Sequence, residues 1–406
     1  MSADGISFKK DEIILLLGAG ASVDAGIPHS AQMVAEIEKE LEGEWRKFKD
    51  LYNYVRSAIF YGQGIKGSFD RKVLYNIESL VVALDELARR EEHPIYPFIG
   101  AWNPRLSQVA GQDFELVFQF KDKILEKLRR EWIEIKDYKD ASYFNGLLRF
   151  QKELNYPLRV FTLNYDLCVE KTYSCEYGEF PERGFGKDDR IWSHEILEDP
   201  AAPAEKNLIL YKLHGSIDWT RVSGTGRLTF SDSTAKIKIA EGELIFGTTY
   251  KLQYVDPYLF LVYQLRRLSL DSKLLLVIGY GFGDEHINGI LAQALRDQSK
   301  RMVVASWSAD FADEARREGA KKELQKYIAG QMNLSPDDQR VILFPMKARD
   351  FLSDALKLEQ LKAYFPPQES LFEDLAPATA APAEPIPSTQ TERHSGEDSI
   401  LPSTRT

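Results

Sequence analysis

The sequence predicts an α/β fold, built on a doubly wound parallel sheet that is interrupted by a large helical insertion. Short apolar runs begin at Ile13, Leu158, Leu208 and Leu274, and small or polar residues follow each of them. Such runs are typical of strands that are buried on both faces, as in a parallel sheet. In the second half of the chain they alternate with helical segments, which is the pattern of a sheet covered by helices.

The first strand, residues 13–17, leads into a loop of small residues. Gly18, Ala19, Gly20, Ala21 and Ser22 follow it directly, and Gly26-Ile27-Pro28 turns the chain again. Small residues let backbone N–H groups approach a phosphate closely, and we expect the N-terminus of a following helix to add positive potential. The dinucleotide fingerprint requires a third glycine where Val23 stands, so the hydride-transfer version of the Rossmann motif fits poorly. A tight strand-to-helix turn without a ligand is the alternative for this loop.

Helices dominate the next part of the chain. Residues 30–42 have helical periodicity, and so do residues 74–92 and 115–135 within a section, from about 43 to 157, that has few strand signals. One apolar stripe of this section comprises Ile77, Leu80, Val81, Leu84 and Leu87. We therefore interpret residues 43–157 as a helical insertion after the first strand–helix unit.

Strand signals return at Leu158. We expect strands at 158–163, 208–213, 244–247, 274–279, 302–307 and 341–344, and helices at about 257–270, 284–298, 310–329 and 348–364. Leu17, Leu163, Leu213 and Ile278 should then lie near the ends of neighbouring strands, where ligands bind in doubly wound sheets. Residues 1–375 form the α/β domain in this interpretation. Residues 376–406 are rich in Pro, Ala, Ser and Thr and lack aromatic residues, which predicts a disordered tail.

Composition excludes several classes of function. The net charge of −10 argues against non-specific binding of nucleic acid or anionic membranes. Cys168 and Cys175 match no familiar metal or redox spacing, so we expect free thiols in a reducing cytoplasm and no metal site. The N-terminus is polar and charged, unlike a signal peptide, and no apolar run reaches the roughly 18–20 residues of a membrane helix.

Polar residues at the predicted strand ends carry the functional signal. Asn164 and Asp166 follow the second strand, His214 follows the third, and the segment Gly279–Asp284 follows the fourth. An amide can position a water, a histidine can relay a proton and carboxylates can stabilise an oxocarbenium-like transition state, which together suit cleavage of a glycosidic bond. Structural alternatives are a helix N-cap for Asn164 or Asp166 and a buried, hydrogen-bonded histidine for His214. The other histidines stand in no comparable setting, although His29 lies close to the first loop.

Four motifs in this order resemble the sirtuin family: Gly-Ala-Gly-Ala-Ser with Gly-Ile-Pro, Thr-Leu-Asn-Tyr-Asp, Lys-Leu-His-Gly-Ser, and Gly-Tyr-Gly-Phe-Gly-Asp-Glu. The resemblance covers roughly residues 10–35 and 155–310. The chain departs from sirtuin deacylases in having His29-Ser30-Ala31 after Gly-Ile-Pro, in lacking four zinc-binding cysteines, and in lacking their substrate-side Val-x-Phe-Gly-Glu pattern. With these departures, the chain resembles the sirtuin-like NADases of bacterial anti-phage defence. Its length is similar to that of the sirtuin-like subunit that is paired with a HerA-type ATPase.

The resemblance implies a role for each motif residue. Gly18, Ala19, Gly20, Ala21 and Ser22 would line the pyrophosphate, and Asn164 would hold the attacking water and the nicotinamide ribose. Asp166 would contact the nicotinamide carboxamide or the helix start, and His214 would act as a base on the ribose hydroxyls. Gly279, Gly281 and Phe282 would contact the adenosine side, while Asp284 would either orient that loop or cap the following helix.

The activity implied is NAD⁺ glycohydrolysis, which releases nicotinamide and ADP-ribose, with NAD⁺ as the substrate and neither cofactor nor metal. The resemblance also implies NAD⁺ depletion in defence, a HerA-type ATPase partner and a homo-oligomer. The alternatives are a protein deacylase or ADP-ribosyltransferase, and a non-catalytic module that binds NAD⁺ or ADP-ribose. A classical dehydrogenase fits least, because Val23 interrupts the glycine fingerprint.

Overall fold

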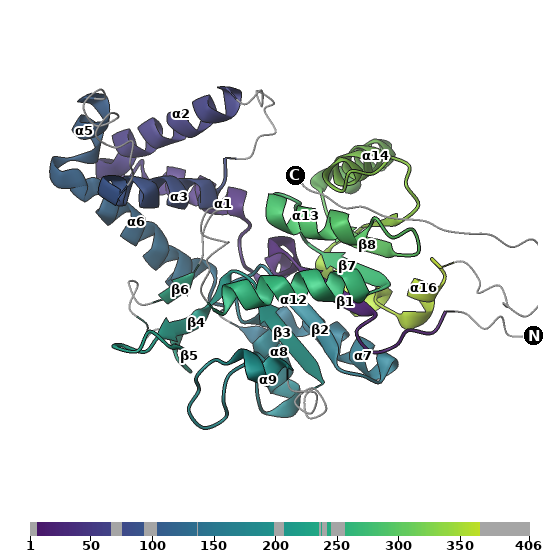
Figure 1. Ribbon diagram of the computed structural model, residues 1–406. Helices are drawn as coiled ribbons and strands as arrows, with labels where there is room; N and C mark the ends of the chain where they lie inside the picture. The colour runs from purple at the N-terminus through teal and green to yellow at the C-terminus, as the bar shows by residue number, and fades with distance from the viewer. Residues whose placement is uncertain are drawn as a thin grey trace, which may run out of the picture.

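A six-stranded parallel sheet forms the centre of the molecule (Figure 1). The computed structural model describes residues 6–65, 75–92, 104–135, 137–198, 207–234, 237, 242–244 and 256–365. The strand order is β3-β2-β1-β7-β8-β9, with bounds β1 Ile13–Leu17, β2 Leu158–Thr162, β3 Leu208–Lys212, β7 Leu274–Ile278, β8 Arg301–Ser306 and β9 Val341–Pro345. The order reverses between β1 and β7, so their carboxyl ends mark a crevice where ligands bind in such folds. The predicted doubly wound α/β fold is confirmed.

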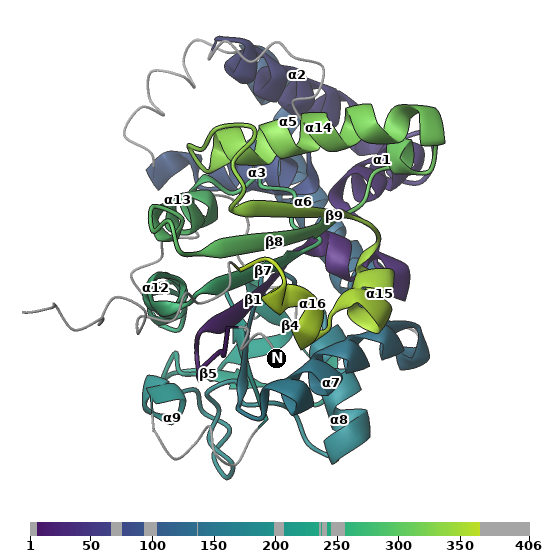
Figure 2. The ribbon, with the colours of Figure 1, turned by 90° about the vertical axis from the view of Figure 1, so that its right-hand side faces the viewer.

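Both faces of the sheet are buried, which explains why the strands are mainly apolar. Leu15 and Leu17 of β1 pack into one hydrophobic cluster, whereas Ile14 and Leu16 pack into another on the opposite face. Figure 2 shows helices on both sides of the strands. The first cluster is covered by α7 Asn145–Leu154, α8 Cys168–Tyr177, α15 Ala348–Asp350 and α16 Leu358–Lys362, and the second by α12 Tyr258–Asp271, α13 Glu285–Ala294 and α14 Glu314–Gln331.

A separate group of helices lies at one end of the molecule (Figure 1). We call it the helical cluster; it comprises α1 Ser30–Glu40, α2 Lys49–Ile65, α3 Ile77–Ala88, α5 Pro104–Ala110, α6 Glu115–Lys127 and the π-helical turn Leu128–Trp132. Its core contains the predicted stripe, with Leu80 and Leu84 fully buried. Leu167 and Ile217, from segments that follow β2 and β3, belong to the same core. The helical cluster is therefore docked at the carboxyl ends of the strands.

The helical cluster does not coincide with the predicted insertion at 43–157. It already includes α1, because Met33, Val34 and Ile37 face its core. At the other end, α7 packs on the sheet through Leu147, Phe150 and other apolar residues. Helical periodicity reveals that a residue faces some core, but it does not reveal which core.

A second, antiparallel sheet has the order β5-β4-β6 and was not predicted. Its strands are β4 Gly215–Arg221, β5 Leu228–Phe230 and β6 Gly242–Leu244. The expected strand at 244–247 is corrected: Leu244 pairs antiparallel with Gly215, and residues 245–247 lie outside the described part. The polar residues Ser216 and Asp218 make β4 hard to recognise in the sequence. Both are buried in the structure, where Asp218 pairs through Oδ2 with Arg183.

Other segments differ from their predicted form. After β1 the chain makes two 3₁₀ turns, Ala19–Ala21 and Val23–Ala25, so no α-helix follows the glycine loop directly. Residues 348–364 form α15, a π-helical turn Phe351–Ala355 and α16 in place of one helix. The short helix α9 spans His194–Glu198. No helix in the described ranges has the length and apolar character that a membrane crossing demands. The predicted disordered tail at 376–406 lies outside those ranges.

Candidate active site

A cavity of about 480 Å³ lies where the carboxyl ends of the central strands meet the helical cluster. Its sheet side is formed by the loops after β1, β2, β3 and β7, and its other side by the starts of α1 and α3 and the π-helical turn. Eight residues of the predicted site line this cavity: Ala19, Gly20, Asn164, Asp166, His214, Gly279, Gly281 and Asp284. The shared location of Asn164 and His214 agrees with the prediction that successive strand ends meet at one crevice.

Two glycine loops form the floor of this cavity by packing backbone against backbone. The Gly20 N–H donates to the carbonyl of Gly279 at 2.8 Å. A Cβ on Gly18 would lie 2.6 Å from the Cα of Tyr280, and a Cβ on Gly279 would lie 2.1 Å from the nitrogen of Ala21. Gly279 also has a φ of +65°, a conformation that favours glycine. These glycines are therefore required for the close contact between the loops.

Within the first loop only Ala19 and Gly20 line the cavity, while Gly18, Ala21 and Ser22 are buried behind its wall. The N–H groups of Gly18, Gly20, Ala21 and Ser22 all donate to carbonyls of the protein. The phosphate cradle expected from this loop is thus largely occupied by internal hydrogen bonds. Helix N-termini do reach the cavity, but they belong to α1 and α3, whose N-cap residues His29 and Asn76 line the wall.

Asn164 is buried and connects the second strand to the first loop. Its Nδ2 donates to the Gly18 carbonyl at 2.9 Å and to Ser22 Oγ at 3.1 Å. Its backbone N–H donates to Thr162 Oγ1 at 3.0 Å. The side-chain amide therefore has one defined orientation at the cavity wall.

Asp166 contacts the helix start, one of the two roles left open by the sequence. Its Oδ1 accepts the N–H of Cys168 at 2.9 Å, in the first turn of α8. The residue also lines the cavity, so its carboxylate combines a capping contact with a place beside the substrate space.

His214 and Asp284 form a buried pair in the cavity wall. His214 is 4% exposed, and its Nε2 lies 3.5 Å from Oδ2 of Asp284. The other oxygen, Oδ1, accepts the N–H groups of His286 at 3.1 Å and Ile287 at 3.4 Å and thereby caps α13. The capping role considered for Asp284 is therefore present on Oδ1, while Oδ2 lies beside His214, a contact that the sequence analysis did not predict.

The loop after β7 is held by buried polar contacts. Tyr280 Oη lies 2.9 Å from Asn288 Oδ1 and 3.1 Å from the backbone nitrogen of Asp284. Phe282 has a φ of +55° and is buried beneath the loop, while its carbonyl accepts Asn288 Nδ2 at 2.9 Å. Phe282 thus supports the cavity wall from behind, and Gly279 and Gly281 face the cavity.

The helical cluster contributes residues that the sequence analysis missed. Four residues at the start of α3 line the cavity, namely Tyr75, Asn76, Ile77 and Glu78. Leu128, the first residue of the π-helical turn, and Ile133, which follows that turn, also line it. The Ile77 N–H donates to Ser30 Oγ at 2.9 Å and so joins the starts of α3 and α1. His29, to which no role was assigned, also lines the cavity. No sequence motif marks these residues, because only tertiary packing brings them to the strand ends.

The cavity has an acidic character. Glu78, Asp166 and Asp284 contribute carboxylates, and the described residues of its lining include no lysine or arginine. Burial raises the pKa of Tyr165 well above its ordinary value, and the charges of Glu78 and Asp284 add to this shift. The Tyr165 phenol therefore stays protonated. Carboxylates around such a cavity favour positive charge on a bound group.

No cluster of three or more His, Cys, Asp or Glu suited to a metal ion occurs in the part of the chain that the structure describes. Cys168 is buried and Cys175 is exposed, and both are free thiols. Burial raises the pKa of the Cys168 thiol well above its ordinary value, and the neighbouring Asp166 adds to the shift. A buried thiol of this kind is unreactive.

The chain is similar to several solved sirtuin structures. A Sir2 homologue in complex with NAD is 13% identical, with a TM-score of 0.40 over 87% of this chain and 90% of the other. A mutant Sir2 homologue in complex with 2′-O-acetyl ADP ribose is 14% identical, with a TM-score of 0.37 over 88% and 94%. Sir2 bound to an acetylated peptide is 11% identical, with a TM-score of 0.36 over 84% and 90%.

No curated protein matches the chain. A family model, that of the SIR2-like domain, matches residues 158–329, which is less than half of the chain. The matched span runs from β2 into α14 and includes Asn164, Asp166, His214 and Asp284, but neither the loop after β1 nor the helices of the helical cluster. The part of the chain from β2 into α14 is therefore similar to the SIR2-like domain.

Proposed function

We propose that this protein is an NAD⁺ glycohydrolase, which cleaves the bond between nicotinamide and ribose and releases nicotinamide and ADP-ribose. One observation carries the proposal: Asn164, Asp166 and the His214–Asp284 pair, from the ends of different strands, line a single cavity of about 480 Å³ beside the two glycine loops. The match to the SIR2-like domain supports a nicotinamide dinucleotide as the substrate.

The proposed reaction is hydrolysis at C1′ of the nicotinamide ribose. The bond from C1′ to the ring nitrogen breaks, its electron pair stays on nicotinamide, and positive charge develops on the ribose. A water attacks C1′, its oxygen becomes the new anomeric hydroxyl, and its proton is lost. NAD⁺ and water thus give ADP-ribose, nicotinamide and one proton.

The described side chains suit these steps. Asn164, whose Nδ2 is held by Gly18 and Ser22, would position the water through Oδ1. His214 would accept a proton from the ribose hydroxyls or the water, with Asp284 close to its Nε2. The carboxylates of Glu78, Asp166 and Asp284 would stabilise the positive charge that develops on the sugar.

Further parts of the proposal rest on the resemblance to anti-phage NADases. We propose that the protein depletes NAD⁺ during defence in the cytoplasm, acts as a homo-oligomer and is activated together with a HerA-type ATPase. NAD⁺ is a substrate, and neither a cofactor nor a metal takes part. The structure describes a single chain, and these statements are open to direct assay.

The decisive experiment follows nicotinamide release from NAD⁺ by the purified protein, alone and with a HerA-type ATPase partner, without any acylated peptide. A glycohydrolase releases nicotinamide under these conditions. A deacylase does so only when an acylated peptide is added, and a binding module retains NAD⁺ without turnover. If the wild-type protein with its partner forms no nicotinamide in the absence of peptide, the glycohydrolase proposal is wrong.

A further inference from the structure

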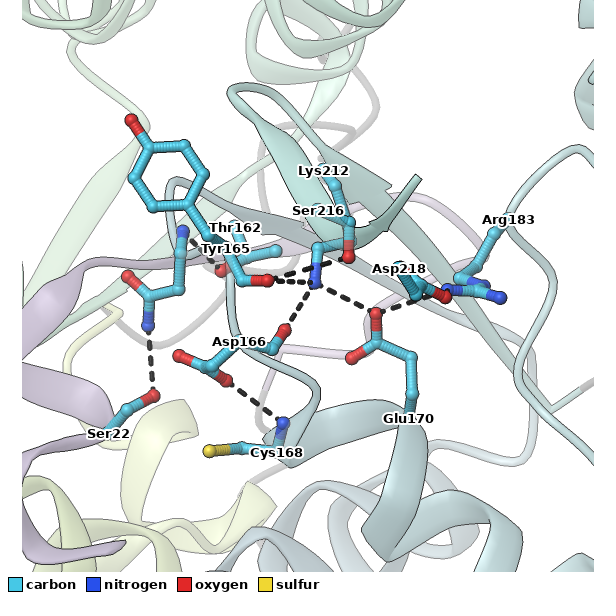
Figure 3. Close-up of polar contacts among 11 residues, drawn as sticks. Ser22, Thr162, Tyr165, Asp166, Cys168, Glu170, Arg183, Lys212, Ser216 and Asp218 are labelled. Atoms are coloured by element: carbon cyan, nitrogen blue, oxygen red, sulfur yellow. Dashed lines mark hydrogen bonds and ion pairs between the residues drawn. The ribbon is translucent and has the colours of Figure 1, made fainter. Parts of the chain in front are cut away.

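A buried network of four charged side chains lies directly behind the cavity wall (Figure 3). Lys212, the last residue of β3, has its Nζ 2.9 Å from Oε1 of Glu170 on α8. Arg183 Nη1 lies 3.5 Å from the same Glu170 oxygen and 2.8 Å from Oδ2 of Asp218 on β4. None of the four side chains is more than 2% exposed. Two cations balance two carboxylates, so the network is neutral as a whole.

Lys212 makes contacts that the other three do not. Its ammonium donates to the carbonyl of Asp166 and lies 3.5 Å from the carbonyl of Tyr165. The Tyr165 carbonyl also accepts the N–H of Ile217 at 3.0 Å. The carbonyls of this loop therefore face β3 and β4, as Figure 3 shows, while the side chains of residues 164–166 line the cavity.

Lys212 connects the two segments that carry the proposed catalytic side chains, Asn164 and His214. It precedes His214 by two residues on the same segment, and its ammonium holds the carbonyls that follow Asn164. A buried ion pair contributes little net stability compared with apolar packing, because desolvation offsets the attraction. It does fix geometry, since an ammonium without its carboxylate and carbonyl acceptors is strongly disfavoured in a dry interior.

We propose that Lys212 is a positioning residue, which holds the Asn164 loop against the His214 segment so that both side chains meet one substrate, and that Glu170 is the carboxylate that keeps this ammonium in place. The inference rests on the proposed hydrolase function for its kinetic readout. Neither residue lines the cavity, so neither contacts the substrate.

The test compares Lys212→Met with the double variant Lys212→Met/Glu170→Gln. The single variant leaves two buried carboxylates with one arginine, so it is expected to lose stability. The double variant restores neutrality, because Arg183 still pairs with Asp218, and most of the stability should return. Its kcat for nicotinamide release should nevertheless fall by about 10–10²-fold, with KM changed less than about threefold, because small displacements of positioned groups are costly to rate.

Lys300→Met is the matched control. Lys300 is another buried lysine, and its Nζ donates to the carbonyls of Ser269 and Leu270 at the end of α12, next to the amino end of β8. This variant should also lose stability but keep the wild-type kcat. The comparison then separates the effect of removing any buried ammonium from the effect of removing the ammonium of Lys212.

Hydrogen exchange gives a readout that does not depend on turnover. Amides of residues 164–168 should exchange faster in the double variant than in wild type, and should be unchanged in Lys300→Met. A double variant with wild-type kcat and wild-type exchange in this segment would show that Lys212 only stabilises the fold. If wild type releases no nicotinamide at all, the proposed function fails, and the exchange of residues 164–168 still decides the positioning role.

Discussion

At the scale of single residues, the side chains proposed to take part in chemistry also have structural contacts. Asp284 caps α13 with one oxygen and approaches His214 with the other. Asn164 binds the first loop through Nδ2, and Asp166 contacts the start of α8. The sequence therefore offers a structural and a functional explanation for each of them, and in this fold the two explanations are compatible.

Replacing His214 or Asn164 by alanine should lower nicotinamide release by at least about 10²-fold, because a positioned acid or base typically contributes 10²–10⁴-fold to rate. NAD⁺ binding should survive, since the rest of the cavity wall is unchanged. Calorimetry with NAD⁺ and the initial rate of nicotinamide formation measure the two effects. Either variant with a rate near that of wild type would remove that residue from the mechanism.

Asp284→Asn and Asp284→Ala separate the two roles of this carboxylate. Asparagine also caps helices, so Asp284→Asn should keep the unfolding midpoint, whereas Asp284→Ala should lose about 1 kcal/mol with the cap. Both variants lose the charge beside His214, and both should turn over NAD⁺ at least about tenfold more slowly. An active, destabilised Asp284→Ala would show that capping is the whole role of Asp284.

At the scale of elements, the site depends on loops that are held from behind. The glycine loops pack directly on each other, and the loop after β2 is held by the buried charges on β3, α8 and β4. Burial raises the pKa of Glu170 although Lys212 and Arg183 oppose this, while for Asp218 the opposing effect of Arg183 and Lys212 exceeds that of burial and lowers the pKa. Asp218 is therefore the carboxylate that stays charged most firmly.

Gly279→Ala should separate the two glycine loops. A methyl group there would lie 2.1 Å from the Ala21 nitrogen, on a residue with a φ of +65°. The left-handed backbone costs about 1–2 kcal/mol and the overlap about 1–3 kcal/mol more, so urea unfolding should show a loss of at least about 2 kcal/mol.

Gly281→Ala is the matched control for stability, because nothing lies within 4 Å of the added Cβ. Its free energy of unfolding should stay within about 0.5 kcal/mol of wild type. Equal losses in the two variants would contradict the packing role assigned to Gly279.

Asp218→Asn should destabilise the fold most at neutral pH. It leaves Arg183 buried with one fewer carboxylate, which costs about 3–5 kcal/mol. The folded pKa of Asp218 lies below its ordinary value of 3.8. The stabilising contribution of its charge is therefore present above that value and is lost as the pH falls toward the folded pKa.

The difference in unfolding free energy between wild type and Asp218→Asn should consequently shrink below about pH 4. Urea unfolding at pH 7 and at several acidic values measures it. Asp232→Asn serves as a control, since Asp232 pairs with Arg190 at an exposed site and its replacement should cost at most about 1 kcal/mol. A difference for Asp218→Asn that grows in acid would refute this assignment.

At the scale of the whole molecule, the cavity lies between two bodies, the parallel sheet and the helical cluster. The sheet brings four strand ends together, and the helical cluster covers them with the starts of α1 and α3. Leu167 and Ile217 lie in the core of the helical cluster, so the loops that carry Asn164 and His214 are part of this contact.

Ending the chain after residue 375 should leave folding and nicotinamide release nearly unchanged. Residues 376–406 contain no aromatic residue and few large apolar ones, so they add little to a hydrophobic core. Thermal unfolding and the assay for nicotinamide release compare the truncated and full chains. Insoluble protein, or a lowered unfolding midpoint, would show that the tail contributes to the fold.

The sequence by itself determined the parallel sheet and the identity of the strand-end residues. Strands buried on both faces must be continuously apolar, so runs such as Ile13–Leu17 are visible without a structure. The carboxyl ends of parallel strands lie at one edge, so Asn164 and His214 could be assigned to one crevice. The helices of the insertion were likewise visible through their periodicity.

Only the tertiary structure decided which groups complete the site. Glu78 and Ile77 reach the cavity because the helical cluster docks on the strand ends, and no local pattern encodes that contact. β4 could not be predicted because its buried Asp218 reads as a surface residue until Arg183, distant in sequence, provides its charge partner. The backbone contact between Gly18 and Gly279 was equally invisible, since local spacing describes a turn but not what packs against it. Periodicity records whether a residue is buried, whereas its partners depend on how distant segments pack.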